Sequence, residues 1–412
     1  MDITRDNCAA IDAEDPLASF RSRFLMPDGV IYLDGNSLGP LSRAARDRLR
    51  EVVDSEWGQG LIGSWTEADW INLPARVGGK IARLIGAEPQ DVIACDSTSI
   101  TLFKLLTAAR ALRPDRRILL TDNENFPTDT YIAESVAHIS REPIELRQVR
   151  ADDIIEAIDN ETAVVSLTHV NYRSGAVFDM AAITEAAHAR GALVLWDLSH
   201  SAGALPADLG ACEADMAVGC GYKYLNGGPG APAWAFVASR LHAELAQPLT
   251  GWMGHRAPFE FSGSYEPAAG LQQMLTGTPP VLALSSLDAS LDDVVDAGIA
   301  RLRTKSVALC ELFINHVEAR CAGQGLVLAS PRDAVHRGSQ VSFRHENGFA
   351  VIRALLDSKV IGDFRAPDIM RFGIAPLYTR FVDVWDAAEK LAEVLESGTW
   401  REPRYSVRGT VN

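Results

Sequence analysis

A lysine and an aspartate, each at the end of an expected buried strand, are the residues best placed for covalent chemistry. Lys223 follows the strand expected at 216–218 and precedes a glycine-dense turn at 226–230, and Asp197 ends the run 192–196. A lysine amine in apolar surroundings loses its proton more readily and can then form an imine with a carbonyl group. An aspartate at the carboxyl edge of an open sheet can pair with a cationic ring nitrogen. Singly, each also has a plain interpretation, as a lysine reaching solvent or as a helix cap.

Two further segments could complete a site for a planar, phosphorylated ligand. The hydroxyl-rich run 96–101 follows the apolar residues 92–94 and opens a helical pattern, and such a helix start attracts phosphate. Phe126 and Asp129 follow the strand expected at 118–120, where an aromatic ring could stack on a planar group. Each segment alone is also consistent with an ordinary capping turn or loop. The four features in this order within one α/β pattern predict a site for pyridoxal 5'-phosphate.

The elements that must position these residues alternate between strand and helix from about residue 90 to residue 240. Helical patterns at 152–158 and 181–190 separate some of the strands. Alternation of this kind predicts an α/β domain with a mostly parallel sheet that helices cover on both faces. The strands are expected at residues 118–120, 163–167, 192–196, 216–218 and 235–237.

The pattern changes after Pro279 and Pro280, where a long helical stretch is expected over 281–320. Short strands and further helices follow it, which predicts a smaller α+β domain at the C-terminal end. These elements are expected at 326–329, 340–343, 349–356 and 382–395. We therefore expect an N-terminal segment 1–45 that packs on the small domain or its partner, a large cofactor-binding domain 46–285 and a small domain 286–412.

The composition excludes several other classes of protein. Lys and Arg number 39 against 54 Asp and Glu, and the net charge of −15 argues against nucleic acid or an anionic membrane as the main partner. The six cysteines are scattered without metal-ligand spacing, so no metal is expected. Neither a signal-peptide pattern nor an apolar run of about 18 residues is present, which favours a cytoplasmic location.

Five segments of the sequence resemble the fold type I pyridoxal-phosphate enzymes, in the branch that holds cysteine desulfurases and class V aminotransferases. Within that branch the resemblance is to the kynureninase family, and it covers essentially the whole chain. Asn36-Ser37-Leu38-Gly39 and Tyr222-Lys223-Tyr224-Leu225-Asn226 are specific to this family. The five segments are residues 32–40, 126–129, 196–203, 221–226 and 251–252.

The resemblance implies a role for each residue of the site. Lys223 would hold the cofactor as a Schiff base, Asp197 would pair with its pyridinium nitrogen and Phe126 would stack on its ring. Tyr222 would bond the phosphate and aid proton transfer. The other implied cofactor contacts are Thr98 and Ser99 on the phosphate, Asp129, Thr168 and His200 around the ring, and Trp252 and Thr278 from the other subunit of a homodimer.

The implied substrate contacts lie further apart in the sequence. Arg371, in the segment 368–372, would grip the substrate's α-carboxylate, a role that suits a bidentate guanidinium. Asn36, Ser64 and Trp65 would lie near the substrate. Thr278 stands where some family members carry asparagine, and Ser64 and Trp65 fall where others place a histidine. The sequence therefore leaves the preference for ring substituents open.

The implied reaction is hydrolysis of L-kynurenine, with 3-hydroxykynurenine as a second candidate substrate, to anthranilate or 3-hydroxyanthranilate and L-alanine in tryptophan catabolism. A class V aminotransferase or a cysteine desulfurase is the first alternative, although no cysteine lies in a recognisable mobile loop. An inactive scaffold with the same fold is the second alternative. Retention of Lys223, Asp197 and Arg371 together argues against that scaffold.

Overall fold

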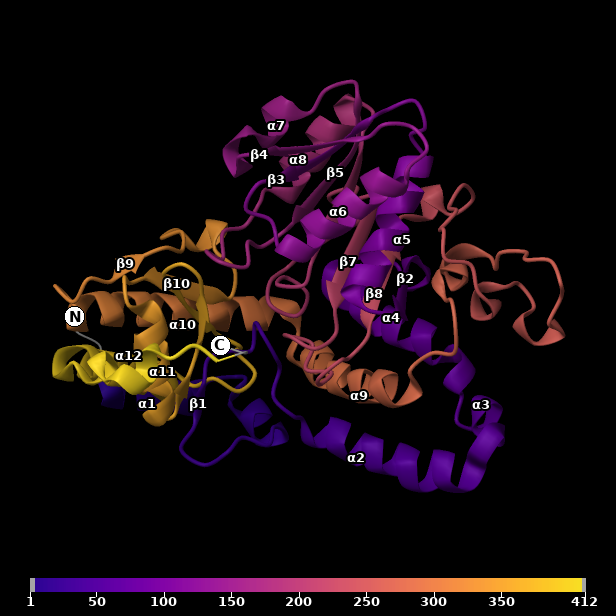
Figure 1. The fold of residues 1–412 in the computed structure, drawn as a ribbon. Helices are drawn as coiled ribbons and strands as arrows, with labels where there is room; N and C mark the ends of the chain where they lie inside the picture. The colour runs from indigo at the N-terminus through magenta and orange to yellow at the C-terminus, as the bar shows by residue number, and fades with distance from the viewer. Residues whose placement is uncertain (1–3, 410–412) are drawn as a thin grey trace.

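A seven-stranded sheet forms the centre of the structure, a computed structural model that describes residues 4–409 (Figure 1). The strand order is β2-β8-β7-β6-β5-β3-β4, and neighbouring strands are parallel except where β8 pairs with β7 and β2. Each strand expected in this region is found. The strands are β2 (Val92–Cys95), β3 (Ile118–Asp122), β4 (Glu145–Val149), β5 (Thr162–Thr168), β6 (Leu193–Asp197), β7 (Met216–Cys220) and β8 (Ala233–Val237).

Helices cover both faces of this sheet, as its continuously apolar strands require. Every residue of β5, β6 and β7 is buried, and successive side chains of β6 and β7 alternate between two separate hydrophobic clusters. One face packs on α4 (Leu73–Ile85), α7 (Ile154–Ala157), α8 (Met180–Ala189) and α9 (Val281–Ala297). The other face packs on α5 (Thr98–Ala111) and α6 (Pro127–Ile139). The mostly parallel, doubly covered sheet is thus confirmed.

A second, antiparallel sheet of four strands follows in the C-terminal part, in the order β12-β13-β10-β9. A third hydrophobic cluster lies between this sheet and its helices. The strands are β9 (Val327–Leu328), β10 (Gln340–Arg344), β12 (Asp363–Arg365) and β13 (Ile369–Gly373). The helices are α10 (Ile299–Arg320), α11 (Gly348–Asp357) and α12 (Phe381–Ser397). This part is α+β, as expected.

Two of the expected helices differ in the structure. The stretch 281–320 is not one helix, because Gly298 has φ +77° and separates α9 from α10. A left-handed residue cannot continue a right-handed helix, and glycine adopts that conformation at little cost. The expected helix 152–158 is reduced to a 3-10 turn and the single turn α7. Within residues 4–409, no helix combines the length and apolar character needed to cross a bilayer.

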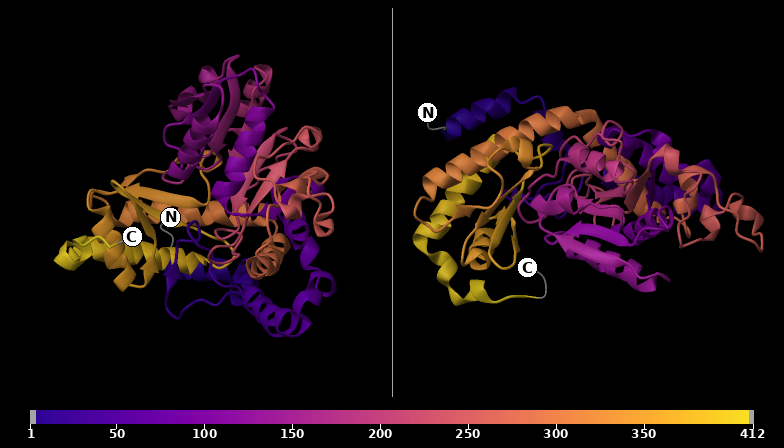
Figure 2. Two further views of the ribbon diagram at one scale, coloured as in Figure 1. Left: turned by 45° about the vertical axis from the view of Figure 1, so that its right-hand side comes forward. Right: turned by 90° about the horizontal axis from the view of Figure 1, so that it is seen from above.

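The N-terminal segment packs against both parts of the molecule. Its helix α1 (Arg5–Glu14) lies beside α12, where Arg5 pairs with Asp386 at 2.7 Å (Figure 2). The strand β1 (Ile31–Tyr32) pairs with β11 (Val360–Ile361). Phe20 and Phe24, in contrast, enter the cluster under the large sheet. Next, α2 (Arg43–Glu51) packs on α9, and α3 (Ser64–Glu67) follows. The domain boundaries at 45 and 285 stay predictions.

Candidate active site

A pocket opens where the parallel strands of the large sheet end. Thr168 is the last residue of β5, Asp197 is the last residue of β6, and Lys223 follows the end of β7. Because these strands are parallel, their carboxyl ends meet at one edge of the sheet, where α/β proteins bind ligands. The cavity measures about 130 Å³. It is lined by Thr98, Ser99, Phe126, Thr128, Asp129, Thr168, Tyr172, Asp197, Ser199, His200, Tyr222 and Lys223.

Lys223 is half-buried and reaches into this pocket from the turn after β7. Its Nζ lies 3.0 Å from His200 Nε2. Burial and the charge of Lys223 both lower the pKa of His200, so the imidazole is neutral and Nε2 accepts the hydrogen bond from Nζ. Phe126 and Tyr222 present their rings to the same amine, with centroids 6.0 and 5.9 Å from Nζ.

The turn that carries Lys223 is held by the N-terminal segment. Gly39 donates its amide to the carbonyl of Tyr222 at 2.8 Å, and a Cβ at Gly39 would lie 2.5 Å from the carbonyl oxygen of Lys223. Only glycine permits so close an approach. Asn226, with φ +57°, closes the turn by donating its amide to the Lys223 carbonyl at 3.0 Å. The sequence motifs around residues 36–39 and 222–226 therefore form one structural unit.

Two buried carboxyl groups lie opposite the lysine. Asp197 accepts a hydrogen bond from the amide of Ser199 at 2.7 Å, yet burial raises its pKa despite the nearby charge of Lys223. Burial and the charge of Asp197 raise the pKa of Asp129 still further above its usual range. Thr168 donates to Asn125 Oδ1 at 2.5 Å. Two desolvated carboxyls of this kind favour a ligand that brings a positive charge to them.

The end of the pocket that Thr98 and Ser99 form suits an anion. Thr98 and Ser99 lie in the first turn of α5, whose free amides and dipole attract negative charge. The buried hydroxyl of Thr98 has no partner among residues 4–409. A buried hydroxyl without a hydrogen bond is costly, so this atom is suited to bind an oxygen of a ligand.

Arg371 and Asn36 lie beside the pocket, but they do not line it. Arg371 sits on β13 with its side chain 2% exposed, and its Nη1 donates to the carbonyl of Tyr172 at 2.7 Å. Since Tyr172 lines the pocket, Arg371 borders the site through that residue. Asn36 is buried and contacts Gln340 at 3.1 Å. The expected substrate anchor thus lies behind the pocket wall that Tyr172 forms.

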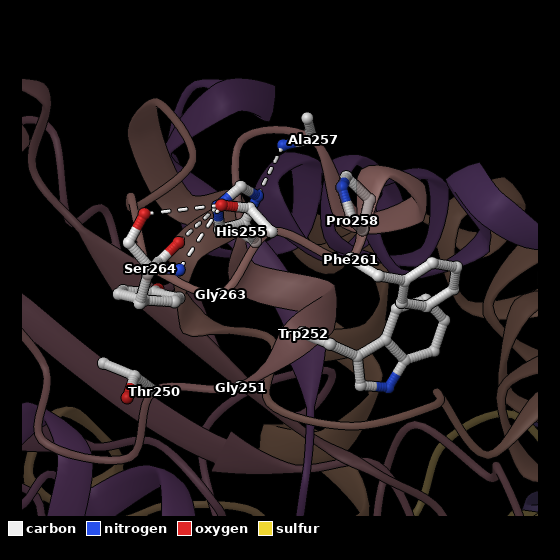
Figure 3. Close-up of a pocket in the computed structure, with 11 residues that line it drawn as sticks. Thr250, Gly251, Trp252, His255, Ala257, Pro258, Phe261, Gly263 and Ser264 are labelled. Carbon is white, nitrogen blue, oxygen red and sulfur yellow. Dashed lines mark hydrogen bonds between the residues drawn. The ribbon is translucent and has the colours of Figure 1, made fainter.

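Ser64, Trp65, Trp252 and Thr278 do not line the pocket of their own chain. Ser64 donates to the carbonyl of Glu56 at 2.6 Å, and Trp65 packs edge-on against Trp70. Trp252 lies in a second cavity and stacks on Phe261, with ring centroids 6.2 Å apart (Figure 3). Thr278 lines a different cavity near Asp96. The sequence assigns Trp252 and Thr278 to the other subunit's site, and that assignment stays a prediction.

The sequence analysis did not assign a role to three residues that line the pocket, Thr128, Tyr172 and Ser199. Tyr172 packs edge-on against Phe126, with ring centroids 5.2 Å apart at 82°. The sequence could have indicated Tyr172 as a site residue, because it follows the carboxyl end of β5 just as Phe126 follows β3. Ser199 lies two residues beyond Asp197 and supplies the amide that bonds it.

Comparison with known proteins agrees with this geometry. Residues 302–391 match the family model described as the kynureninase C-terminal domain. The chain is 49% identical to the kynureninase of Pseudomonas fluorescens over 413 residues, which is 99% of each chain. It is also 49% identical to the kynureninase of Burkholderia mallei over 414 residues, again 99% of each. The chain belongs to the kynureninase family.

Solved structures that resemble the chain are more distant and show the fold alone. The cysteine desulfurase of Thermococcus onnurineus superposes with a TM-score of 0.76 at 15% identity, covering 92% of this chain and 98% of that one. A C-DES mutant with glycine covalently linked to its PLP cofactor gives 0.78 at 18% identity, covering 90% and 99%. The kynureninase-family chain therefore has the fold of type I pyridoxal-phosphate enzymes.

The pocket residues fit pyridoxal phosphate on their own chemistry. The partnerless hydroxyl of Thr98 at the start of α5 matches a phosphate oxygen, and the desolvated carboxyl of Asp197 matches a protonated ring nitrogen. Lys223 supplies the amine that such a cofactor needs. A phosphate end, an acid end and an amine thus line one cavity.

Proposed function

We propose that this protein hydrolyses L-kynurenine to anthranilate and L-alanine with pyridoxal 5'-phosphate bound at the Lys223 pocket. The observation that carries the proposal is the full-length match, at 49% identity, to relatives named kynureninase. The pocket supports it, because Lys223, Asp197 and the start of α5 surround one cavity. Hydrolysis of 3-hydroxykynurenine would use the same residues.

Pyridoxal phosphate, when bound, supplies an electron sink for the negative charge that develops at the substrate's α-carbon. Lys223 would hold the cofactor through Nζ, and the freed Nζ would be the base that removes the substrate's α-proton. Neutral His200 keeps Nζ in place by accepting its hydrogen bond. Asp197 would pair with the cationic ring nitrogen, and Phe126 would stack on the ring.

Tyr222 and the first turn of α5 supply hydrogen-bond donors for the phosphate and the substrate. Burial raises the pKa of Tyr222 above its usual range, so its hydroxyl stays protonated and donates a hydrogen bond. We assign that donor to the phosphate and to proton transfer at the substrate, and we assign Thr98 and Ser99 to the phosphate. Asp129 and Thr168 complete the wall, and Arg371 receives the α-carboxylate.

A cysteine desulfurase with the same fold would need a thiolate at the site. Burial raises the pKa of Cys95 to about 12, and it also raises the pKa values of Cys310 and Cys321 to about 11. Cys220, the cysteine next to the Lys223 turn, is buried and directs its thiol to the carbonyl of Ser199 at 3.9 Å. The structure therefore favours hydrolysis over desulfuration.

The proposal includes a homodimer whose two active sites share residues. Apolar side chains near Trp252 and after α2 are left exposed in the single chain, including Phe261 at 75% and Ile62 at 80%. Phe259 and Phe261 pack against Trp252 and form an exposed aromatic cluster, which supports an interface at this place. The segment around Trp252 also projects from the body of the chain (Figure 1). We assign Trp252 and Thr278 to the partner's pocket on this basis.

The test combines a spectrum with an assay. Purified protein loaded with pyridoxal phosphate should show a visible absorption band and should release fluorescent anthranilate from L-kynurenine. Lys223→Ala should lose both signals, because no amine is left to bind the cofactor. A band without anthranilate would remove kynurenine as the substrate, and no band after reconstitution would remove the cofactor.

A further inference from the structure

Arg371 has few hydrogen-bond donors to offer a ligand. A guanidinium carries five N–H donors. Nε donates to Asp363 Oδ1 at 2.8 Å, and Nη2 donates to Asp363 Oδ2 at 2.5 Å and to Ser37 at 2.8 Å. Nη1 uses one donor on the carbonyl of Tyr172 at 2.7 Å. A single N–H on Nη1 is left, whereas a carboxylate prefers two parallel donors.

A second arginine with unused donors lies next to Arg371. Arg365 is on β12, which pairs with β13 in a register that sets Asp363 opposite Arg371. Residues two apart on a strand share a face, so Arg365 lies on the same side as Asp363 and Arg371. Its Nη2 is 2.8 Å from Asp363 Oδ2, which therefore bridges the two guanidinium groups. The buried Nε of Arg365 has no partner among residues 4–409.

The two arginines also act on the Lys223 pocket. The charges of Arg371 and Arg365 both lower the pKa of His200, which lines that pocket. Burial lowers the pKa of Arg365, and Tyr172, another residue that lines the pocket, raises it. The pair therefore borders the pocket through the contact of Arg371 with Tyr172 and is not an isolated surface cluster.

The charge balance around the pair favours an incoming anion. Two carboxyls, Asp34 and Asp363, face the two guanidinium groups. Burial and the charge of Asp363 raise the pKa of Asp34 to about 7, so Asp34 is about half protonated at neutral pH and largely uncharged below it. The group then holds a net positive charge, which one substrate carboxylate neutralises.

We infer that Arg365 is a second anchor for the substrate's α-carboxylate, completing with the free N–H of Arg371 a clamp of two guanidinium groups. This inference rests on the proposed function, which supplies an amino-acid substrate. The clamp selects ligands with a free carboxylate and rejects the matching amides, because an amide brings no negative charge to the two cations.

The test compares two ligands that differ only in the carboxylate, L-alanine and L-alaninamide, by calorimetry on the cofactor-loaded protein. Arg365→Met should weaken the binding of L-alanine about ten- to hundredfold, which is the loss expected for charge-assisted hydrogen bonds. Its affinity for L-alaninamide should stay within about twofold. Arg147→Met is the matched control, because Arg147 is also a strand arginine between two carboxylates, Glu145 and Asp159. It should change neither affinity.

Each other outcome has a defined meaning. If Arg365→Met weakened the binding of both ligands equally, Arg365 would have a structural role and the clamp would be overturned. Unchanged binding of L-alanine would also overturn the clamp. Where Arg365→Met does not fold, Arg365→Lys keeps the charge without the fork and should weaken L-alanine alone by an intermediate factor. A wild-type protein that selects L-alanine through Arg365 but releases no anthranilate from L-kynurenine would retain the clamp and lose the proposed function.

Discussion

At the scale of single residues, the site depends on the charge of Asp197. Asp197→Asn keeps the shape of the side chain and an oxygen that can accept from the Ser199 amide, but it removes the negative charge. We expect kcat to fall about a hundredfold or more, as when one preorganised electrostatic contact is lost. Steady-state assays with L-kynurenine measure this loss. Asp122→Asn is the control, because Asp122 is also a buried acid at a strand end that caps an amide, that of Glu124. A similar loss in both variants would contradict the assignment.

The protonation of Asp34 makes stability depend on pH. Its pKa is about 7 in the folded chain against an ordinary value of 3.8. Between these values the folded state keeps a proton that the unfolded state has released, so stability falls as pH rises from about 4 to 7. Asp34→Asn should show a smaller loss of unfolding free energy between pH 5 and pH 8 than wild type, in urea titrations. Equal losses would exclude Asp34 as the titrating group.

Substrate binding should also depend on the protonation of Asp34. Asp363, Arg365, Arg371 and Ser37 face Asp34, and ionisation of Asp34 places a second negative charge beside both arginines. KM for the anionic substrate should therefore rise as pH passes above about 7, while kcat changes less. The rise should be absent in Asp34→Asn. A pH profile of KM for both proteins, with the substrate's own amine titration subtracted, decides this.

At the scale of the element, a buried lysine fixes α5, the helix that we assign to the phosphate. Lys104 in α5 is fully buried, and its Nζ bonds Asp96 at 2.6 Å, the carbonyl of Met274 at 2.7 Å and Thr276 at 2.5 Å. Lys104→Met leaves the Asp96 carboxylate without its cation, so unfolding in urea should show a loss of about 3–5 kcal/mol. Lys80→Met, at a partly exposed ion pair with Asp288, should cost at most about 1 kcal/mol. Similar small losses in both would show that the Lys104 network is not structural.

The sequence predicted the elements that obey a simple period and missed those that tertiary contacts define. Five strands of the large sheet, β3 and β5 to β8, were predicted because both faces are buried and their residues are mostly apolar, whereas β2 was noted only as an apolar run. The strand β4 was missed, since its charged residues are partly exposed at the sheet edge. The break at Gly298 was missed because helical spacing continues on both sides of it.

In the candidate site, too, local patterns predicted some features and tertiary contacts define the others. Strand ends placed Asp197 and Lys223 at one edge of the sheet, the family resemblance added Thr168, and the pocket brings the three together. The pairing of Asp363 with Arg371 depends on the register of β12 against β13, which no local pattern specifies. The position of Arg365 follows from that register, so its free donors become visible only in the folded chain.

At the scale of the whole molecule, the proposal of shared active sites predicts complementation between two inactive variants. Lys223→Ala removes the amine from its own pocket, and Trp252→Ala removes the side chain that we assign to the partner's pocket. In a mixed dimer one pocket then carries both defects and the other carries none. Equal mixing with subunit exchange should restore about a quarter of wild-type activity, since half of the dimers are mixed and each has one intact pocket.

The mixing experiment separates a shared site from a merely dimeric one. If Trp252 served the pocket of its own subunit, each pocket of a mixed dimer would carry one defect, and the mixture would stay as inactive as its components. Lys223→Ala mixed with Asp197→Asn provides this negative case, because both residues line the same pocket. Activity should appear only after subunits exchange, so its growth with time should follow dimer exchange measured by native mass spectrometry. Recovery in the first mixture and none in the second would place Trp252 across the interface.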